Sequence, residues 1–498
     1  MSSVAPQTRA DAELLGHPRG LYTLFMTEMW ERFSYYGMRA LLVLFMVDQV
    51  GNGGMGLTDQ TATAIYGLYT AAAYLAALPG GWIADRLMGA QRAVWIGGIV
   101  IMSGHFVLAI PGIGTFFLGL ILVALGTGLL KPNISAIVGE LYGFDDDRRD
   151  AGFTIFYMGI NLGAAIGPLI CGWLAGGNWH YGFAAAGVGM LFGLIQFRAT
   201  RGYLGSAGRY PEGADSLSAG ARTKAWALIA AFLALVLGLL AAGLTGALTF
   251  DAVRLAQSTT SVIGVIALAY FVSLFLFGRL TRDERGRVIV ILALFMAAAM
   301  FWAGFEQAGS SLNLFAERYT IREFGELVIP AAWFQSLNPV FIIVLAPLYS
   351  MMWVALARRH LNPSSPLKFA VGLVLLGAGF AVMIGAAELV AQGNQVLPTW
   401  LFFTYLLHTM GELALSPVGL SSVSKLAPRR FVGQMMGVWF LANSLGYIIA
   451  GLIAGGFNPD AIDQMPGLYL QIVATTAGAG VLLALCAPVL KRLTAGPH

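Results

Sequence analysis

Four ionisable residues interrupt an apolar stretch near the start of the chain, EMWERFSYYGMRALL. Glu28, Glu31, Arg32, Tyr35 and Arg39 are spaced by three, one, three and four residues, so on a helix they form one polar stripe. Each such charge costs about 2.5–3.5 kcal/mol inside a membrane. Glu28 and Arg32 form an i to i+4 pair that offsets part of this cost. Buried charges in membranes usually mark ion or proton paths, and a salt bridge that only joins helices is the alternative.

Three more charges lie inside apolar segments: Lys131 in GTGLLKPNIS, Glu306 in FWAGFEQAGSSLN and Glu412 in HTMGELALSPVGLS. Glu140 and Glu388 are nearer to segment ends, where they can reach the interface. If the central charges face one cavity, four acids stand against three bases, and an apolar site disfavours the extra charge. This balance suggests proton coupling, in which protonation of a glutamate frees a base to bind a substrate carboxylate.

The composition requires these charges to be positioned by membrane helices. The 498 residues are 58% hydrophobic and 11% charged, with a mean hydropathy of +0.74, which is typical of an integral membrane protein. A helix needs roughly 20 apolar residues to cross the bilayer. We predict fourteen spans, with ends uncertain by several residues: 21–47, 62–84, 92–110, 114–140, 151–173, 181–199, 223–247, 258–278, 288–315, 331–357, 368–390, 397–424, 433–455 and 467–490.

The residues outside these spans predict the topology. The first twenty residues lack the apolar core of a signal peptide, so a short soluble tail is expected. Most of the 29 Lys and Arg residues fall on the side of the N-terminus, and only Arg254, Arg318 and Arg322 fall on the other. The basic side is the cytoplasmic one, so both termini are predicted to be cytoplasmic, in a cell (inner) membrane. Cys171 and Cys486 lie in apolar spans and are expected to be packing residues.

The order of the spans predicts three parts. A polar basic stretch, RGYLGSAGRYPEGADSLSAGARTK, separates six spans from a further pair and six more. We therefore expect an all-α membrane protein with an N-terminal six-helix bundle (1–200), a cytoplasmic linker with an inserted helix pair (201–285) and a C-terminal six-helix bundle (286–498). GGWIADRLMGAQR between the second and third spans resembles the cytoplasmic loop motif of the major facilitator superfamily, whose two bundles surround a central cavity.

Several motifs together resemble the proton-dependent oligopeptide transporters of that superfamily, in particular the bacterial members. They are EMWERFSYYG, GLLKPN, FTIFYMGINLGAAIGP, FWAGFEQ and GELALSP. The resemblance runs from about Leu21 to the last span and implies a proton-coupled symporter that imports di- and tripeptides by alternating access. A histidine that is important in animal members has no counterpart here, so carboxylates would have to handle the proton.

The resemblance also implies residue roles. Proton coupling and gating would involve Glu28, Glu31, Arg32, Lys131 and Glu306. Arg39 and Lys131 would meet the peptide carboxylate, and Glu412 would meet its amino group. The other implied substrate-binding residues are Tyr35, Tyr36, Tyr74, Asn161, Trp302, Asn338, Ser416 and Trp439. A zwitterionic peptide needs cations at one end, an anion at the other and adaptable aromatic walls between them, so the chemistry agrees.

Structural interpretations of several of these residues remain open. An aromatic residue chosen by pattern alone is more often a packing or interfacial residue than a pocket wall. Gly159, Gly163 and Gly167 form a small-residue ladder for close helix packing. Asn161, in the same segment, can instead form a hydrogen bond that joins two helices. Prolines next to Asn338 and Ser416 predict helix breaks, which suit both gating and binding.

Other classes of protein fit less well. A membrane enzyme is disfavoured because no metal-spaced cluster, phosphate loop or nucleophile motif is present, so we expect no enzyme, no metal and no cofactor, with protons as the coupling ion. Opposed buried charges disfavour a channel. The closest alternative is a proton-coupled transporter of another solute, such as nitrate, a drug or an amino acid conjugate. We expect no nucleic-acid partner, a lipid bilayer as surroundings, and a monomer.

Overall fold

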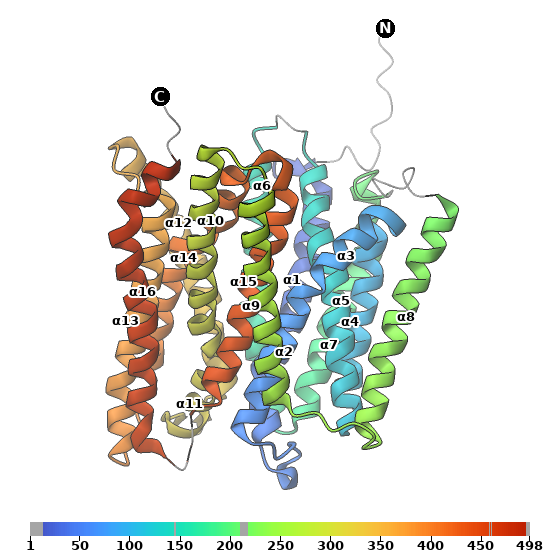
Figure 1. Ribbon diagram of the computed structural model, residues 1–498. Coiled ribbons are helices and arrows are strands. Elements are labelled where there is room, and N and C mark those ends of the chain that lie inside the picture. The colour runs from blue at the N-terminus through green and yellow to red at the C-terminus, as the bar shows by residue number, and fades with distance from the viewer. Residues whose placement is uncertain (1–12, 144–145, 210–217, 458, 460, 495–498) are drawn as a thin grey trace. The chain divides into compact units, whose positions relative to one another are not determined.

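The computed structural model describes residues 13–143, 146–209, 218–457, 459 and 461–494. The described chain is almost wholly helical (Figure 1). Two short hairpins join Glu13–Leu14 (β1) to His17–Pro18 (β2) and Glu323–Phe324 (β3) to Leu327–Val328 (β4). The helices are α1 (Arg19–Val47), α2 (Asp59–Leu75), α3 (Ala77–Ile83), α4 (Ala90–Leu108), α5 (Ile113–Glu140), α6 (Arg149–Ala175), α7 (Trp179–Thr200), α8 (Ala219–Leu244), α9 (Ala252–Phe277), α10 (Arg282–Phe305), α11 (Ser311–Tyr319), α12 (Leu337–Arg358), α13 (Ser365–Ala391), α14 (Thr399–Leu426), α15 (Val432–Ala454) and α16 (Met465–Thr494).

The predicted all-helical membrane fold is confirmed. Each predicted span coincides with one helix or with a run of consecutive helical elements. Among the described residues, 12 helical stretches are apolar and long enough to cross a membrane. The remaining two spans correspond to α1 and α14, which have 29 and 28 residues and so exceed the roughly 20 needed. The charged stripe lowers the mean hydropathy of α1.

Two predicted spans are interrupted. The second consists of α2, α3 and a π-helical turn, Ala84–Met88, before α4. The ninth divides into α10 and α11 at Ser310, whose φ of −124° and ψ of −97° are not helical. Gln307 stabilises this interruption because its amide donates to the carbonyls of Ala303 (3.2 Å) and Ala450 (3.0 Å) and accepts from Ser311 Oγ (2.6 Å). Side chains therefore satisfy backbone groups that water would otherwise need to reach.

The proline-based helix breaks are only partly correct. α14 continues as a helix through Ser416, so the break predicted there is wrong. Asn338 lies in the first turn of α12, directly after a 3-10 turn, Ala331–Ser336. A proline in a first helical turn loses no helical hydrogen bond, so Pro339 marks the start of this helix rather than a break inside it.

By their internal contacts the elements form two compact units. Unit 1 comprises Met1–Leu41 and Ala72–Phe250, and unit 2 comprises Leu42–Ala71 and Asp251–His498. The inserted pair is shared, since α8 belongs to unit 1 and α9 to unit 2. α8 is not buried along its most apolar stretch, whereas α9 packs on α10 through Phe271 and Phe295, whose ring centres are 5.8 Å apart. The three-part division by sequence remains a prediction.

Close packing by glycine determines how α1 sits in unit 1. A Cβ at Gly159 would lie 3.0 Å from the Phe25 carbonyl, and one at Gly163 or Gly167 would clash with the carbonyls of Met29 or Phe33. α6 therefore approaches the backbone of α1, as the small-residue ladder predicts. Cys171 and Cys486 differ. Cys171 is fully buried next to Gly37, as expected, but Cys486 is exposed, so its predicted packing role is wrong because its face of α16 is uncovered.

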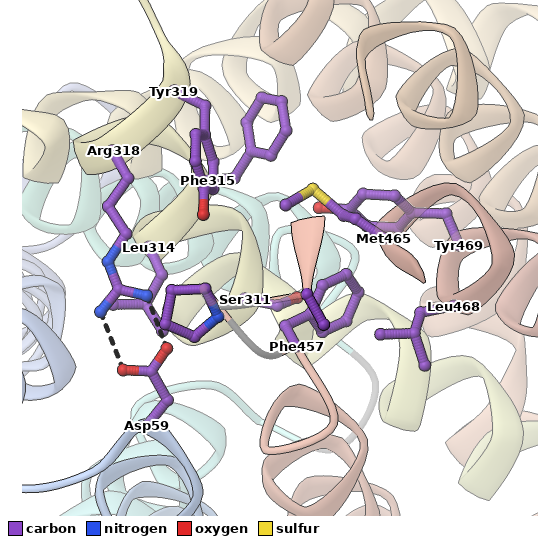
Figure 2. A pocket seen from close by; sticks show the side chains of 12 residues that line it. Asp59, Ser311, Leu314, Phe315, Arg318, Tyr319, Phe457, Met465, Leu468 and Tyr469 are labelled. Atoms are coloured by element: carbon purple, nitrogen blue, oxygen red, sulfur yellow. Dashed lines mark hydrogen bonds and ion pairs between the residues drawn. The ribbon is translucent and has the colours of Figure 1, made fainter. Parts of the chain in front are cut away.

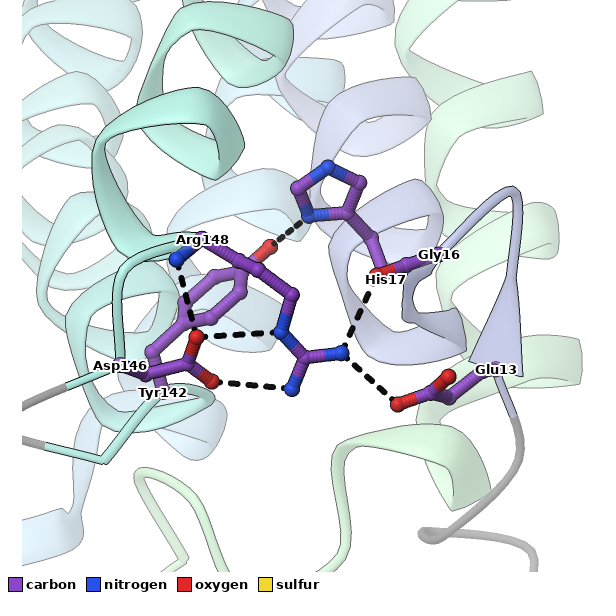
Figure 3. Close-up of polar contacts among 6 residues, drawn as sticks. All are labelled: Glu13, Gly16, His17, Tyr142, Asp146 and Arg148. Atoms are coloured by element: carbon purple, nitrogen blue, oxygen red, sulfur yellow. Dashed lines mark hydrogen bonds and ion pairs between the residues drawn. The ribbon is translucent and has the colours of Figure 1, made fainter.

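A polar clasp ties the first hairpin to the loop between α5 and α6 (Figure 3). Arg148 donates to Glu13 (2.8 Å), to the Gly16 carbonyl (3.1 Å) and to both carboxylate oxygens of Asp146, while His17 Nδ1 is 2.9 Å from the Tyr142 hydroxyl. The hydrogen bonds from Arg148 hold the pKa of Asp146 below its usual range. Partial burial raises the pKa of Tyr142 to about 12, so this phenol stays neutral.

Candidate functional site

The polar stripe of α1 is buried inside unit 1. Glu28, Glu31 and Arg32 are each at most 2% exposed. Arg32 Nε lies 3.1 Å from Glu28 Oε1, which confirms the predicted i to i+4 pair, and also bonds the Glu31 carboxylate. One oxygen of each glutamate and Nη2 of Arg32 have no hydrogen-bond partner within the described chain. Two carboxylates thus share one guanidinium, and each keeps an unsatisfied oxygen.

Tyrosine rings surround the cations of unit 1. Arg32 Cζ lies 5.3 Å from the centre of the Tyr35 ring, and Arg39 Cζ lies 5.4 Å from that of Tyr36. The two tyrosines contact each other edge to face, with ring centres 5.4 Å apart. An aromatic face attracts a cation that lies within about 6 Å of the ring centre. These tyrosines therefore orient the cations without neutralising them.

Lys131, on α5, also lies against a tyrosine ring. Its Nζ lies 3.6 Å above the ring of Tyr74 and acts electrostatically on Glu28, so α5 joins the charged group of α1. Pro132 follows directly, and Asn133 donates to the carbonyls of Leu129 (2.6 Å) and Gly80 (3.3 Å). These bonds fix the α3–α5 contact beside the lysine, a positioning role that sequence reasoning missed.

Asn161 interacts with its own helix. It is 4% exposed, and its Nδ2 donates to the carbonyl of Tyr157 at 3.0 Å. No hydrogen bond between its side chain and Arg39 or Lys131 is found in the described structure. A substrate role for Asn161 remains a prediction.

In unit 2 the structure brings Asn338 and Glu412 together. Asn338 Nδ2 donates to Glu412 Oε2 at 2.9 Å and to Thr409 Oγ1 at 3.0 Å. α12 thus orients the carboxylate of α14, and Ser416 lies one helical turn beyond it. Thr409, whose hydroxyl donates to the Tyr405 carbonyl at 2.7 Å, was missed because nothing in its local pattern is unusual.

Glu306 lies in the 3-10 turn that interrupts α10 and α11. It is 4% exposed and accepts a hydrogen bond from Tyr66 at 3.2 Å. Tyr66 is fully buried, and sequence reasoning missed it because its partner is 240 residues away. Trp302 contacts Tyr447, and Trp439 contacts Phe369, so both tryptophans have packing partners within unit 2.

A small cavity in unit 2 lies apart from these groups (Figure 2). Arg318 forms a two-pronged ion pair with Asp59, at 2.5 Å and 2.8 Å, on one side of the cavity. Ser311, Phe315 and Tyr469 contribute to its lining. None of the residues predicted for substrate or proton binding lines it. The ion pair joins α2 to α11 within unit 2.

A chain of membrane-length helices with buried, organised charges is a multi-spanning membrane transport protein. A model of the POT family matches residues 91–465, and the chain belongs to this family. Members of the family are transporters, so this protein is a transporter and not an enzyme.

Named relatives are similar over nearly their full length. The peptide transporter YePEPT of Yersinia enterocolitica is 44% identical, with 96% of this chain and 95% of the relative covered. The di-/tripeptide transporter of Lactococcus lactis subsp. cremoris is 39% identical, with 97% and 98% covered. A crystal structure of a peptide transporter POT in complex with sulfate has a TM-score of 0.90, 43% identity and 97% coverage of both chains. These matches confirm the family resemblance.

Proposed function

We propose that this protein is a proton-coupled symporter that imports di- and tripeptides by alternating access. The names of its relatives support peptides as the substrate class. The coupling part depends chiefly on the α1 cluster, where Glu28 and Glu31 share Arg32 and each keeps an oxygen without a hydrogen-bond partner in the described structure. A proton on one carboxyl leaves one carboxylate for the Arg32 guanidinium, so the group no longer needs Lys131 as a second counter-charge.

Substrate binding follows from the same groups. Arg39 and Lys131, each seated against a tyrosine face, bind the peptide carboxylate. Arginine contributes a two-pronged contact and lysine a point charge. Glu412, oriented by Asn338, binds the peptide ammonium.

Coupling links these two functions. When Glu28 or Glu31 takes up a proton, its hold on the nearby bases weakens, and Lys131 becomes available for the peptide carboxylate. Glu306 contributes a further acid from unit 2, where Tyr66 donates to it. Either α1 glutamate can be the proton carrier in this scheme. The aromatic residues Tyr35, Tyr36, Tyr74, Trp302 and Trp439, with Asn161 and Ser416, form the adaptable walls for variable side chains.

The test is uptake of labelled dialanine into proteoliposomes with an inward proton gradient, with and without an uncoupler. The wild type should accumulate dialanine, and the uncoupler should abolish accumulation. A variant with Glu28→Gln and Glu31→Gln should lose gradient-driven accumulation but keep counterflow exchange, which needs no net proton movement. Glu388→Gln, an exposed glutamate on α13, is the matched control. Gradient-driven accumulation that survives the double change contradicts the coupling scheme.

Another small solute remains the alternative substrate. Arg39 and Lys131 alone would also suit a simple anion such as nitrate, whereas Glu412 opposes one and suits a zwitterion. Competition separates the two: excess unlabelled dipeptide should suppress dialanine uptake, and nitrate or a free amino acid should not. Failure of dialanine to accumulate in folded protein, together with uptake of another solute, would reassign the substrate and leave the coupling groups in place.

The topology belongs to the same proposal. The protein acts as a monomer in the cell's inner membrane, with both termini in the cytoplasm. In unit 2 most of the basic residues lie around the start of α10, from the end of α12 to the first turn of α13, between the end of α14 and the start of α15, and in the last turn of α16, which favours a cytoplasmic location for that end. Labelling of single cysteines on either side of the membrane tests this orientation.

A further inference from the structure

α12 has a widely exposed apolar surface within unit 2. Only 6% of its most apolar stretch is buried, against 56% for α13. Val344, Leu348 and Met351 are 58%, 51% and 61% exposed, respectively. Their spacing of four and three residues places them along one face of the helix. This face is long enough for an acyl chain to lie along it, and the unbranched side chain of Met351 can adapt its shape to such a chain.

Exposed basic residues end the same helix. Arg358 and Arg359 close α12, and His360 follows in the left-handed conformation with φ of 58°. The N–H groups of His360 and Leu361 donate to carbonyls of the preceding turn, which fixes the reversal. A glycine usually occupies this left-handed position. Here the turn instead presents three consecutive basic side chains next to the apolar face.

A fourth basic group comes from α13. Lys368 Nζ lies 4.4 Å from the centre of the Trp353 ring on α12, so the two helices share this contact. The stretch between Glu326 and Glu388 contains no acidic residue. Elsewhere at this end of unit 2, Arg430 pairs with Glu284 at 3.0 Å.

The charges at the α12–α13 turn are not compensated in the same way. Across the described residues, neither arginine at the end of α12 nor Lys368 takes part in an ion pair. The general excess of positive charge on cytoplasmic loops explains the sign of this cluster. It does not explain why two consecutive arginines and a lysine that lies against Trp353 gather at one turn beside an exposed apolar helix.

We propose that the α12–α13 turn is a binding site for an anionic phospholipid. Its phosphate lies among Arg358, Arg359 and Lys368, and one acyl chain lies along the exposed face of α12. Arginine forks match phosphate oxygens, and basic sites at membrane helix ends attract anionic headgroups. A free phosphate would use only the cations, so the adjoining apolar face favours a lipid. The site is independent of the substrate and of the coupling ion.

Native mass spectrometry of the full-length protein in detergent tests this site. The protein is titrated with phosphatidylglycerol or with phosphatidylcholine of the same acyl chains. We expect tighter binding of phosphatidylglycerol, and a loss of about fivefold for each cation removed. Arg358→Gln, Arg359→Gln and Lys368→Gln combined should therefore weaken phosphatidylglycerol binding by on the order of a hundredfold. The matched control, Arg282→Gln, Arg285→Gln and Lys425→Gln, removes the same charge from the same end of unit 2, with two of the three changes on α10, whose apolar stretch is 61% buried, and should change binding less than about twofold.

A second variant keeps the charge. Trp353→Leu removes only the seat of Lys368 and should weaken phosphatidylglycerol binding by about threefold, with phosphatidylcholine unchanged. It also carries the test if thermal unfolding shows that the triple variant does not fold. Equal losses in the triple variant and its control would overturn the proposal, since binding would then follow net charge alone. Equal affinity of the wild type for both lipids, or displacement of the lipid by equimolar inorganic phosphate, would overturn it too.

Discussion

Glu412→Gln is the sharpest test of how the peptide is held. The change removes the charge but keeps a carbonyl oxygen that can still accept the 2.9 Å hydrogen bond from Asn338. A hydrogen bond between charged groups contributes about 1.5–3 kcal/mol, and Glu412 is only half-buried, so we take about 2 kcal/mol for its contact with the ammonium. That corresponds to about a 30-fold loss of affinity for dialanine.

The assay compares two ligands that differ only at the amino end. Dialanine carries the ammonium, and N-acetyl-dialanine lacks it but keeps the carboxylate. In competition against labelled dipeptide, the wild type should prefer dialanine by about 30-fold. The Glu412→Gln variant should bind both ligands with similar, weak affinity. Glu388→Gln should retain the wild-type preference.

A specific pattern would refute this reasoning. If Glu412→Gln weakened both ligands by the same factor, the glutamate would support the fold of α14 rather than contact the ammonium. Asn338→Leu gives an independent check, because it removes the amide that orients Glu412 and keeps the charge. It should reduce the preference for dialanine only partially, by about five- to tenfold, because the charge of Glu412 remains and only its orientation, worth about 1–1.4 kcal/mol, is lost.

Three further predictions concern unit 1. Tyr74→Leu removes the ring beneath Lys131 and should raise the KM for dialanine about fivefold, as expected for a cation–π contact near 1 kcal/mol; an unchanged KM contradicts a substrate role for this lysine. Gly163→Val places side-chain atoms against the α1 backbone and should lower the thermal stability by about 1–3 kcal/mol, measured by thermal unfolding in detergent. Asp146 stabilises the docked hairpin through Arg148 above its unfolded pKa of 3.8, and this contribution is lost as the pH falls through the lowered folded pKa. Hydrogen exchange of residues 13–18 should therefore quicken below that pH in the wild type, and Asp146→Asn should remove this acid dependence.

The charged stripe could be predicted because its signal is local. The spacing of Glu28, Arg32 and Arg39 places them on one face of a helix, and the cost of burial identifies that face as functional. The structure agrees with the Glu28–Arg32 pair at 3.1 Å. Helix positions were predictable for the same reason, since a membrane span is a local property of hydropathy.

The remaining features depend on partners far apart in the chain. The Tyr66–Glu306 bond spans 240 residues, and no local pattern marks Tyr66 within its apolar segment. The Asn338–Glu412 pair spans 74 residues, and only the family resemblance linked the two. The sequence did not predict the interruption at Ser310, because hydropathy does not distinguish one continuous helix from two shorter helices. Side chains such as Gln307 stabilise the interruption, and their targets are carbonyls that only the fold identifies.

The glycine ladder of α6 and the polar stripe of α1 lie on different faces of the same helix contact, and the ladder affects how the stripe is oriented. Phe25, Met29 and Phe33 on α1 meet the glycines. Met29 directly follows Glu28 and Phe33 directly follows Arg32, so each lies about 100° around the helix from a residue of the stripe. Close approach on the glycine face therefore fixes the rotation of α1, and with it the direction in which the stripe points. A larger residue at position 163 pushes against the backbone of α1. It therefore loosens the packing and also rotates α1, which changes the direction of the carboxylates. If the rotation of α1 sets the direction of the polar stripe, Gly163→Ala should shift the pH dependence of uptake. An alanine at Gly97 on the α4–α5 contact, where a Cβ would lie 2.8 Å from the Gly126 carbonyl, should reduce stability without such a shift.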